Sequence, residues 1–275
     1  MGNKVSIIIP CFNDANFIEQ AVQSALDQTY LDKEIIVVDD GSNLKTKLVL
    51  KILEPKLDHL ITQANNGPSA ARNVGIQVAT GEYILVLDSD DYFEKDFCGK
   101  AISIFRKNSD VKIVSSYGRR FIKAPFGPTI KPAGGDLKNF LVRNASLGTM
   151  FRKQDWKDVG GYDEKMKIGL EDWEFYIRLH QNGGRTYIIQ EILFLYREKK
   201  NSRSHIANLH KYELLSYIYK KHQLLFMNHF DLFVDSLLNK LKSEESQKLR
   251  IRNKIEFQLG KRILQPFRIL KAWFR

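Results

Sequence analysis

Carboxylates gather at two places in the sequence where buried strands are expected to end. Asp88-Ser89-Asp90 follows the apolar run Tyr83–Leu87, and Asp39-Asp40 follows Glu34–Val38. Ligands of open parallel sheets bind at the carboxyl ends of the strands, so these acids are expected at one edge of a sheet. Neighbouring carboxylates repel one another unless a cation lies between them. Mg²⁺ or Mn²⁺ is commonly held by one or two carboxylates plus substrate phosphates, which makes Asp88 and Asp90 candidate metal ligands.

One acidic strand end alone would favour a solvated turn, whereas two favour a ligand site. No glycine-rich dinucleotide motif follows the first apolar run, where Pro10-Cys11-Phe12-Asn13 stands, and no GxxxxGK phosphate loop is present. Redox cofactors and P-loop chemistry are therefore disfavoured. A nucleotide can still bind, with Asp40 accepting from a base N–H and Asp88 or Asp90 reaching the ribose and a metal.

The elements that must position these acids alternate along the chain. Apolar runs rich in Ile and Val predict buried strands, and residues at helix spacing predict helices between them. Asn16 and Glu19 are spaced as a capping box. The expected strands are Val5–Ile9, Glu34–Val38, Tyr83–Leu87 and Thr186–Tyr196; the expected helices are Phe17–Leu26, Ser69–Val78, Asp96–Lys107, Glu171–Asn182 and those from His205 onward; Lys123–Gly135 is expected to be a loop crossing the active face. The alternation predicts an α/β fold with an open, mostly parallel sheet flanked by helices.

The charge of the chain is uneven. Its net charge is +11, yet residues 1–198 carry 26 basic and 26 acidic side chains, whereas residues 199–275 carry 17 and 6. We therefore expect a catalytic domain over residues 1–204 and a basic helical extension over residues 205–275. Cys11 and Cys98 have neither zinc-site nor disulfide-framework spacing. We expect a cytoplasmic protein, because neither a signal peptide nor a run of ~20 apolar residues is present.

Several blocks of the sequence form a specific pattern through their order and spacing. They are Ser6-Ile7-Ile8-Ile9-Pro10-Cys11-Phe12-Asn13, Gln28-Thr29-Tyr30, Glu34-Ile35-Ile36-Val37-Val38-Asp39-Asp40-Gly41-Ser42, Gly67-Pro68-Ser69-Ala70-Ala71-Arg72-Asn73 and Gly81-Glu82-Tyr83-Ile84-Leu85-Val86-Leu87-Asp88-Ser89-Asp90-Asp91. Together these blocks resemble glycosyltransferase family 2, whose fold is called GT-A, and the resemblance covers roughly residues 3–200.

The resemblance implies a site in two halves. The first half binds a nucleotide-sugar donor; its candidates are Pro10, Asn13, Asp39, Asp40, Arg72, Asp88, Ser89 and Asp90, with Mn²⁺ or Mg²⁺ on Asp88 and Asp90. The second half provides the catalytic residues Asp172 and Glu171, with Asp172 as the base. Acids that complement a helix dipole are the alternative interpretation of this pair. Acceptor binding is expected around Gly148-Thr149-Met150-Phe151, and Trp173 is either a site residue or core.

The implied reaction is inverting transfer of one sugar, with uridine as the preferred base, to a hydroxyl of a glycan or lipid-linked glycan acceptor, as in bacterial surface polysaccharide assembly. The Gln-x-x-Arg-Trp element of processive synthases is missing, which favours single addition. Lys199 stands where many members place a histidine near the leaving diphosphate. The alternative function is a sugar-nucleotide nucleotidyltransferase, although such enzymes usually carry a glycine-rich loop after the first strand.

The segment Leu249–Arg275 alternates apolar residues with Lys and Arg. Interleaved cations and aromatic residues suit an anionic membrane surface, which would place the protein on the inner face of the plasma membrane. A helix docked on the catalytic domain is an equal alternative. Nucleic acid is not an expected partner, because no nucleic-acid-binding module accompanies the charge.

Overall fold

The computed structural model describes residues 3–121, 127–199, 202–255, 257, 259–260 and 263–264. Contacts within the chain divide it into two compact units, Met1–Phe226 and Met227–Arg275. The first unit thus continues past residue 204, where the sequence analysis places the domain boundary. Among the described residues, no helix combines the length and apolar character needed to cross a bilayer.

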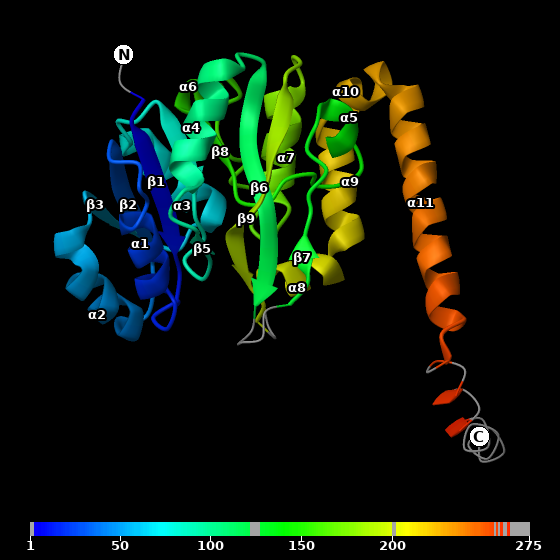
Figure 1. Cartoon of the computed structure of the whole chain (residues 1–275), viewed down its shortest axis with the longest axis horizontal. Helices are drawn as coiled ribbons and strands as arrows, with labels where there is room; N and C mark the ends of the chain where they lie inside the picture. The colour runs from blue at the N-terminus through cyan, green and yellow to red at the C-terminus, as the bar shows by residue number, and fades with distance from the viewer. Residues whose placement is uncertain are drawn as a thin grey trace. The chain divides into compact units, whose positions relative to one another are not determined.

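The elements of the first unit alternate between strands and helices, as Figure 1 shows. In chain order they are β1 (Val5–Cys11), α1 (Ile18–Leu26), β2 (Lys33–Asp40), α2 (Leu44–Leu53), the 3₁₀ turn Glu54–Lys56, β3 (His59–Gln63), α3 (Pro68–Val78), β4 (Tyr83–Val86), β5 (Tyr92–Phe93), α4 (Phe97–Lys107), β6 (Val111–Phe121), β7 (Thr129–Ile130), α5 (Leu137–Phe140), β8 (Met150–Arg152), α6 (Lys153–Asp158), α7 (Glu171–His180), β9 (Arg185–Arg197), α8 (Arg203–Leu209) and α9 (Lys211–Lys221). Two further helices, α10 (Gln223–Asn228) and α11 (Phe230–Arg252), follow.

The strands form one mixed sheet in the order β3-β2-β1-β4-β8-β6-β9-β5, with β7 paired to β6. The first four strands in this order are mutually parallel, and β8 is antiparallel to both β4 and β6. The chain leaves β1 toward β2 and β3 on one side, whereas β4 lies on the other side of β1. Such a reversal of strand order opens a crevice at the carboxyl ends of the strands. The predicted α/β fold, an open sheet flanked by helices, is confirmed.

Alternating side chains of β1 pack against helices on opposite faces of the sheet. Val5, Ile7 and Ile9 belong to the core cluster that includes apolar residues of α1 and α4. Ile8 faces α3 instead, where a Cβ added to Gly75 would lie 2.6 Å from its Cγ2 atom. Helix α3, which carries Arg72, therefore approaches the sheet closely because Gly75 has no side chain. This packing fixes Arg72 beside the strand ends.

Several local expectations differ from the structure. The capping box is wrong, because Phe17 is the N-cap of α1 without a side-chain hydrogen bond, and Asn16 accepts from Lys45. Strand β2 runs through Asp40, so the pair Asp39-Asp40 is the end of the strand rather than the turn after it. Of the loop expected over residues 123–135, residues 123–126 lie outside the described chain and Thr129–Ile130 pairs with β6.

Candidate active site

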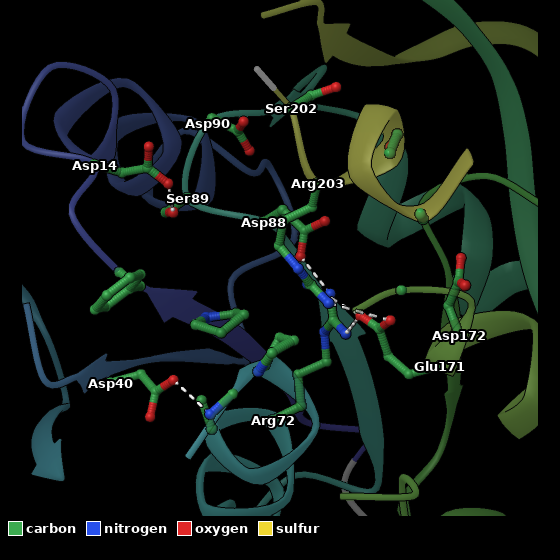
Figure 2. A pocket seen from close by; sticks show the side chains of 18 of the residues that line it. Asp14, Asp40, Arg72, Asp88, Ser89, Asp90, Glu171, Asp172, Ser202 and Arg203 are labelled. Atoms are coloured by element: carbon green, nitrogen blue, oxygen red, sulfur yellow. Dashed lines mark hydrogen bonds and ion pairs between the residues drawn. The ribbon is translucent and has the colours of Figure 1, made fainter. Parts of the chain in front are cut away.

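The carboxyl ends of β1 and β4 open into a cavity of about 630 Å³. Figure 2 shows acidic side chains from several elements around it. The residues expected from the sequence that line it are Pro10, Asp40, Arg72, Asp88, Ser89, Asp90, Glu171 and Asp172. The fold thus brings the donor-binding candidates of the first half of the chain together with the two acids of α7.

Arg72 joins these two halves. Its buried guanidinium donates from Nη2 to Asp88 Oδ1 at 2.7 Å and from Nη1 to Glu171 Oε1 at 2.8 Å. Figure 2 shows it between the two carboxylates. Burial by itself would raise the pKa of both acids, but Arg72 and, next, Arg203 together outweigh burial, so the pKa of each acid is lowered. Asp88 and Glu171 are therefore held as carboxylates.

Asp172 is in a different electrostatic environment. It is the second residue of α7, and the N-cap of this helix, Leu170, has a left-handed backbone (φ 63°) that is uncommon for a residue with a side chain. Asn144 Nδ2 donates to its Oδ2 at 2.8 Å. Burial, and next the charge of Glu171, raise the pKa of Asp172 to about 6. A carboxyl group with this pKa can accept a proton near neutral pH.

Three of the residues expected to bind the donor accept hydrogen bonds from loops of the chain itself. Asp40 accepts from Gln63 Nε2 and from the backbone N–H groups of Asn66 and Gly67 at 2.7–2.9 Å, while still lining the cavity. Asp39 accepts from the Ser42 N–H at 2.9 Å, and Asn13 Oδ1 accepts from the Asn43 N–H at 2.7 Å. Neither Asp39 nor Asn13 is among the cavity residues. These two residues shape the loops after β1 and β2.

Asp90 forms an ion pair with a lysine that lies far from it in the sequence. Lys199 Nζ lies 2.6 Å from Asp90 Oδ2 and 3.0 Å from Asp14 Oδ1. Ser89 in turn donates to Asp14 Oδ2 at 2.6 Å, and Figure 2 shows Asp14 beside Ser89. Burial, followed by repulsion from Asp88, raises the pKa of Asp90.

The donor set at Asp88 and Asp90 fits a divalent cation that also binds phosphates. In the described part of the chain no group of three or more His, Cys, Asp or Glu side chains is arranged to hold a metal. The described contacts of Asp88 and Asp90, however, use one carboxylate oxygen of each. Each retains a second oxygen, and one or two carboxylates completed by phosphates are a common Mg²⁺ arrangement.

The sequence analysis did not identify every residue of the cavity. Asp14 lies four positions after Pro10, and its relation to Lys199 depends on contacts 185 residues apart. Helix α8 forms a further wall of the cavity. The boundary predicted between residues 204 and 205 falls inside this helix. The additional lining residues from this part of the chain are Ser202, Arg203, Ser204, Ala207 and Asn208.

The residues expected to bind the acceptor are divided between core and cavity. Met150 and Phe151 are fully buried, and Trp173 is buried with its indole N–H donating to the Phe140 carbonyl at 2.6 Å. Gly148 and Thr149 line a smaller neighbouring cavity of about 80 Å³, which also touches Arg72 and Asp88.

The chain matches the profile described as Glycosyl transferase family 2 over residues 6–162, and the one described as N-terminal domain of galactosyltransferase over residues 141–203. The chain belongs to glycosyl transferase family 2. The acids at the ends of β2 and β4 lie inside the first matched region, and the acids of α7 lie inside the second. As a family 2 member, the protein is an enzyme of the glycosyltransferase class.

Named relatives of this glycosyltransferase include the putative teichuronic acid biosynthesis glycosyltransferase TuaG of Bacillus subtilis, 30% identical over 213 residues, or 73% of this chain and 81% of the relative. The chondroitin synthase of Pasteurella multocida is 32% identical over 187 residues, 65% of this chain. The chain spans only 19% of that synthase and 46% of an uncharacterised Haemophilus influenzae glycosyltransferase.

Solved structures show the same fold. Residues 1–349 of S. aureus TarS in complex with UDP-GlcNAc superpose with a TM-score of 0.72 at 19% identity, covering 93% of this chain and 77% of that one. A Pyrobaculum calidifontis mannosyltransferase with GDP-Man and Mn²⁺ gives a TM-score of 0.61 at 16% identity, covering 93% and 82%.

Proposed function

We propose that this glycosyltransferase moves a single sugar from a UDP-linked donor to a hydroxyl of a glycan or lipid-linked glycan, with inversion at the anomeric carbon. The observation that carries this proposal is that Asp172 shares one cavity with Asp88 and Asp90 while its pKa, about 6, is suited to a base. The uridine base is supported by the TarS complex with UDP-GlcNAc. The names of TuaG and chondroitin synthase support a role in polysaccharide assembly, which we place at the bacterial cell surface.

The chemical step is one displacement. The acceptor oxygen forms a bond to the anomeric carbon, the bond from that carbon to the diphosphate oxygen breaks, and the acceptor proton goes to Asp172. Asn144 holds the Asp172 carboxylate through Oδ2 at 2.8 Å. A positioned base contributes about 10²–10⁴-fold to such a step. Glu171, which is bound by Arg72 and Arg203, acts in this proposal by fixing Arg72 and the start of α7.

Departure of the nucleoside diphosphate leaves negative charge beside Asp88 and Asp90. Mn²⁺ or Mg²⁺ held by these two residues would supply Lewis-acid stabilisation of that charge. Arg72 keeps Asp88 ionised and in place, because its Nη2 atom is 2.7 Å from the carboxylate. The chain itself therefore prepares the carboxylates for a phosphate-bound cation.

The reaction products separate this proposal from the alternative of a sugar-nucleotide nucleotidyltransferase. A glycosyltransferase releases nucleoside diphosphate from a nucleotide sugar, and slow hydrolysis does so even without acceptor. A nucleotidyltransferase instead releases pyrophosphate from a nucleoside triphosphate and a sugar phosphate. The test is incubation of the protein with labelled nucleotide sugars and Mn²⁺. Pyrophosphate release from UTP and a sugar phosphate, without UDP release from any UDP-sugar, would overturn the proposal.

We also propose that the basic tail attaches this cytoplasmic enzyme to an anionic membrane. The supporting observation is a set of exposed apolar side chains in the described part of the tail: Leu249, Ile251, Ile255, Leu259 and Ile263. Lys and Arg stand between most of these residues in the sequence, at positions 250, 252, 254, 261 and 262. The full chain is expected to sediment with phosphatidylserine vesicles in moderate salt and not with phosphatidylcholine vesicles. Equal sedimentation after deletion of residues 249–275 would contradict this attachment.

A further inference from the structure

Lys199 occupies a position in the cavity that the proposed chemistry has not yet used. It stands two residues after the end of β9 and lines the same cavity as Asp40, Asp88 and Asp172. Two carboxylates from different loops hold its ammonium group, Asp90 at 2.6 Å and Asp14 at 3.0 Å. An ammonium group has three N–H donors, so these contacts leave one donor for a ligand.

The surroundings of Lys199 hold its ammonium group in place through the two ion pairs with Asp90 and Asp14. The ring of Phe17 lies beneath the ammonium, 4.9 Å from its centroid to Nζ. Asp14 is itself fixed by the hydroxyl of Ser89 at 2.6 Å. The cation is thus positioned before any ligand arrives, which is the arrangement that stabilises developing charge most effectively.

The charges that line the cavity indicate what Lys199 does. Among the residues that the structure describes, seven acidic side chains line the cavity, against the four basic ones Arg72, Lys167, Lys199 and Arg203. A nucleotide diphosphate entering beside Asp88 and Asp90 therefore meets like charge, which opposes binding. Arg72 is engaged by Asp88 and Glu171, and Arg203 by Glu171 and the Lys167 carbonyl. Lys199 differs from Arg72 and Arg203 because it pairs with Asp90, one of the two carboxylates beside which the diphosphate would bind.

We propose that Lys199 contacts the diphosphate of the nucleotide donor as a resident cation, and that Asp14 is the residue that positions it. The inference rests on the proposed function. Lys199 uses Oδ2 of Asp90, so it leaves the other oxygen of that carboxylate for a divalent ion. The lysine therefore provides diphosphate affinity that persists when metal is removed.

Binding without metal tests this proposal. UDP and uridine, with GDP and guanosine in parallel, are titrated calorimetrically into the full chain in EDTA and again in Mn²⁺. In EDTA, Lys199→Ala is expected to weaken diphosphate binding by about 10- to 100-fold, because a charged hydrogen bond is lost, and to leave nucleoside binding unchanged. Lys199→Arg is expected to retain most of the affinity, and Lys199→Gln provides a variant of similar length if the alanine variant folds poorly. Lys100→Ala, which removes a lysine paired with Glu191 outside the cavity, is the matched control.

The role of Asp14 is tested through a double-mutant cycle. Asp14→Asn is expected to weaken diphosphate binding in the wild-type background and not to weaken it in the Lys199→Ala background, because Asp14 supports binding only through the lysine. Equal diphosphate affinity of wild type and Lys199→Ala in EDTA would overturn the inference, as would a parallel loss of nucleoside binding. If the wild-type chain binds neither diphosphate better than its nucleoside even in Mn²⁺, the proposed function fails instead.

Discussion

Arg72 Nη1 donates to Glu171 Oε1 at 2.8 Å, although the two residues are 99 positions apart in the chain. The same guanidinium reaches Asp88 at 2.7 Å. Helix α3 therefore connects the end of β4, where the donor is proposed to bind, with the start of α7, where the proposed base lies. Movement of either acid would disturb the other through this side chain.

Replacing Arg72 by lysine tests this connection. An ammonium group cannot bridge two carboxylates as a planar guanidinium does, so one buried acid loses its partner. We expect Arg72→Lys to lower the free energy of unfolding by about 2–3 kcal/mol, below the full loss for a buried pair because Glu171 keeps Arg203. Urea denaturation measures this change. The control Arg185→Lys alters an exposed pair with Asp110, so its unfolding in urea is expected to stay close to that of wild type.

The pH dependence of transfer tests Asp172. Its pKa is about 6, and the proposed base must be ionised, so kcat/KM is expected to fall about tenfold per pH unit below about 6. Asp172→Asn is expected to lower kcat by about 10²–10⁴-fold while UDP binding is unchanged. Initial rates from pH 4.5 to 8 check both results. A flat profile through pH 6, or normal transfer by the asparagine variant, would remove Asp172 from this role.

The contribution of Asp172 to the free energy of unfolding should fall with rising pH, whereas its contribution to kcat/KM should rise. Because the folded-state pKa is raised, the acid contributes stability below pH 4 that is lost as the pH rises through about 6. Asp172→Asn is therefore expected to be at least as stable as wild type at pH 7, and relatively less stable at pH 4. Urea denaturation at these two pH values measures the difference between the two proteins.

Much of this arrangement was predictable because it depends on local patterns. Buried strands have apolar runs, and the acids at the strand ends stand where a parallel sheet places ligands, so the sequence places Asp88 and Asp90 at the edge where the cavity opens. Asn13 and Asp39 are next to such positions, yet their side-chain oxygens accept from backbone N–H groups of nearby loops. Whether a strand-end Asx side chain faces a ligand or closes a turn is decided by backbone geometry that the sequence pattern does not specify.

Long-range pairs were the part that sequence patterns could not supply. Asp14 meets Lys199 across 185 residues, and α8 forms a cavity wall although its residues have the composition of an ordinary surface helix. Strand β3 was missed because its side chains are half-buried or exposed rather than apolar throughout. Trp173 could not be assigned by type alone, since an aromatic ring suits both sugars and cores, and its indole N–H found a carbonyl in the core.

The proposed role of Asp90 as a ligand of a divalent cation predicts a specific response to metal. We expect EDTA to reduce sugar transfer, and Asp90→Asn to abolish the response to added Mn²⁺ because one of two carboxylate ligands is lost. Donor hydrolysis during Mn²⁺ titration measures this. Asp27→Asn, which changes an exposed acid bonded to Gln23, is the matched control and should titrate as wild type does. Full Mn²⁺ activation of the Asp90 variant would contradict the assigned ligand.

The helix that carries Asp172 is attached to α9 by Glu174. This fully buried acid contacts Arg178, Lys221 and His222. Burial would raise its pKa, but the hydrogen bonds from His222 and Arg178 outweigh burial and lower the pKa to about 2. Glu174→Gln is expected to lower the free energy of unfolding at pH 7 by about 3 kcal/mol, since the surrounding cations lose their counter-charge.

The sign of the pH effect at Glu174 follows from its lowered pKa. Its stabilisation is present above the unfolded value of 4.5 and is lost as the pH falls toward about 2. Unfolding of wild type and Glu174→Gln should therefore converge between pH 4.5 and 2. The control Glu191→Gln changes an exposed ion pair and should differ little from wild type at any pH. A constant gap between wild type and Glu174→Gln would show that packing, not charge, attaches α9.

The left-handed backbone of Leu170 predicts that relieving its strain raises the free energy of unfolding and lowers kcat. At φ 63° a side chain costs about 1 kcal/mol that glycine does not. Leu170→Gly is therefore expected to raise the free energy of unfolding by up to about 1 kcal/mol, while kcat falls because the turn that aims Asp172 is loosened. Leu170→Ala retains the strained Cβ and removes the rest of the side chain, so the difference between the two variants isolates the backbone. If both variants lose kcat equally, the side chain of Leu170 in the cavity matters and the strain does not.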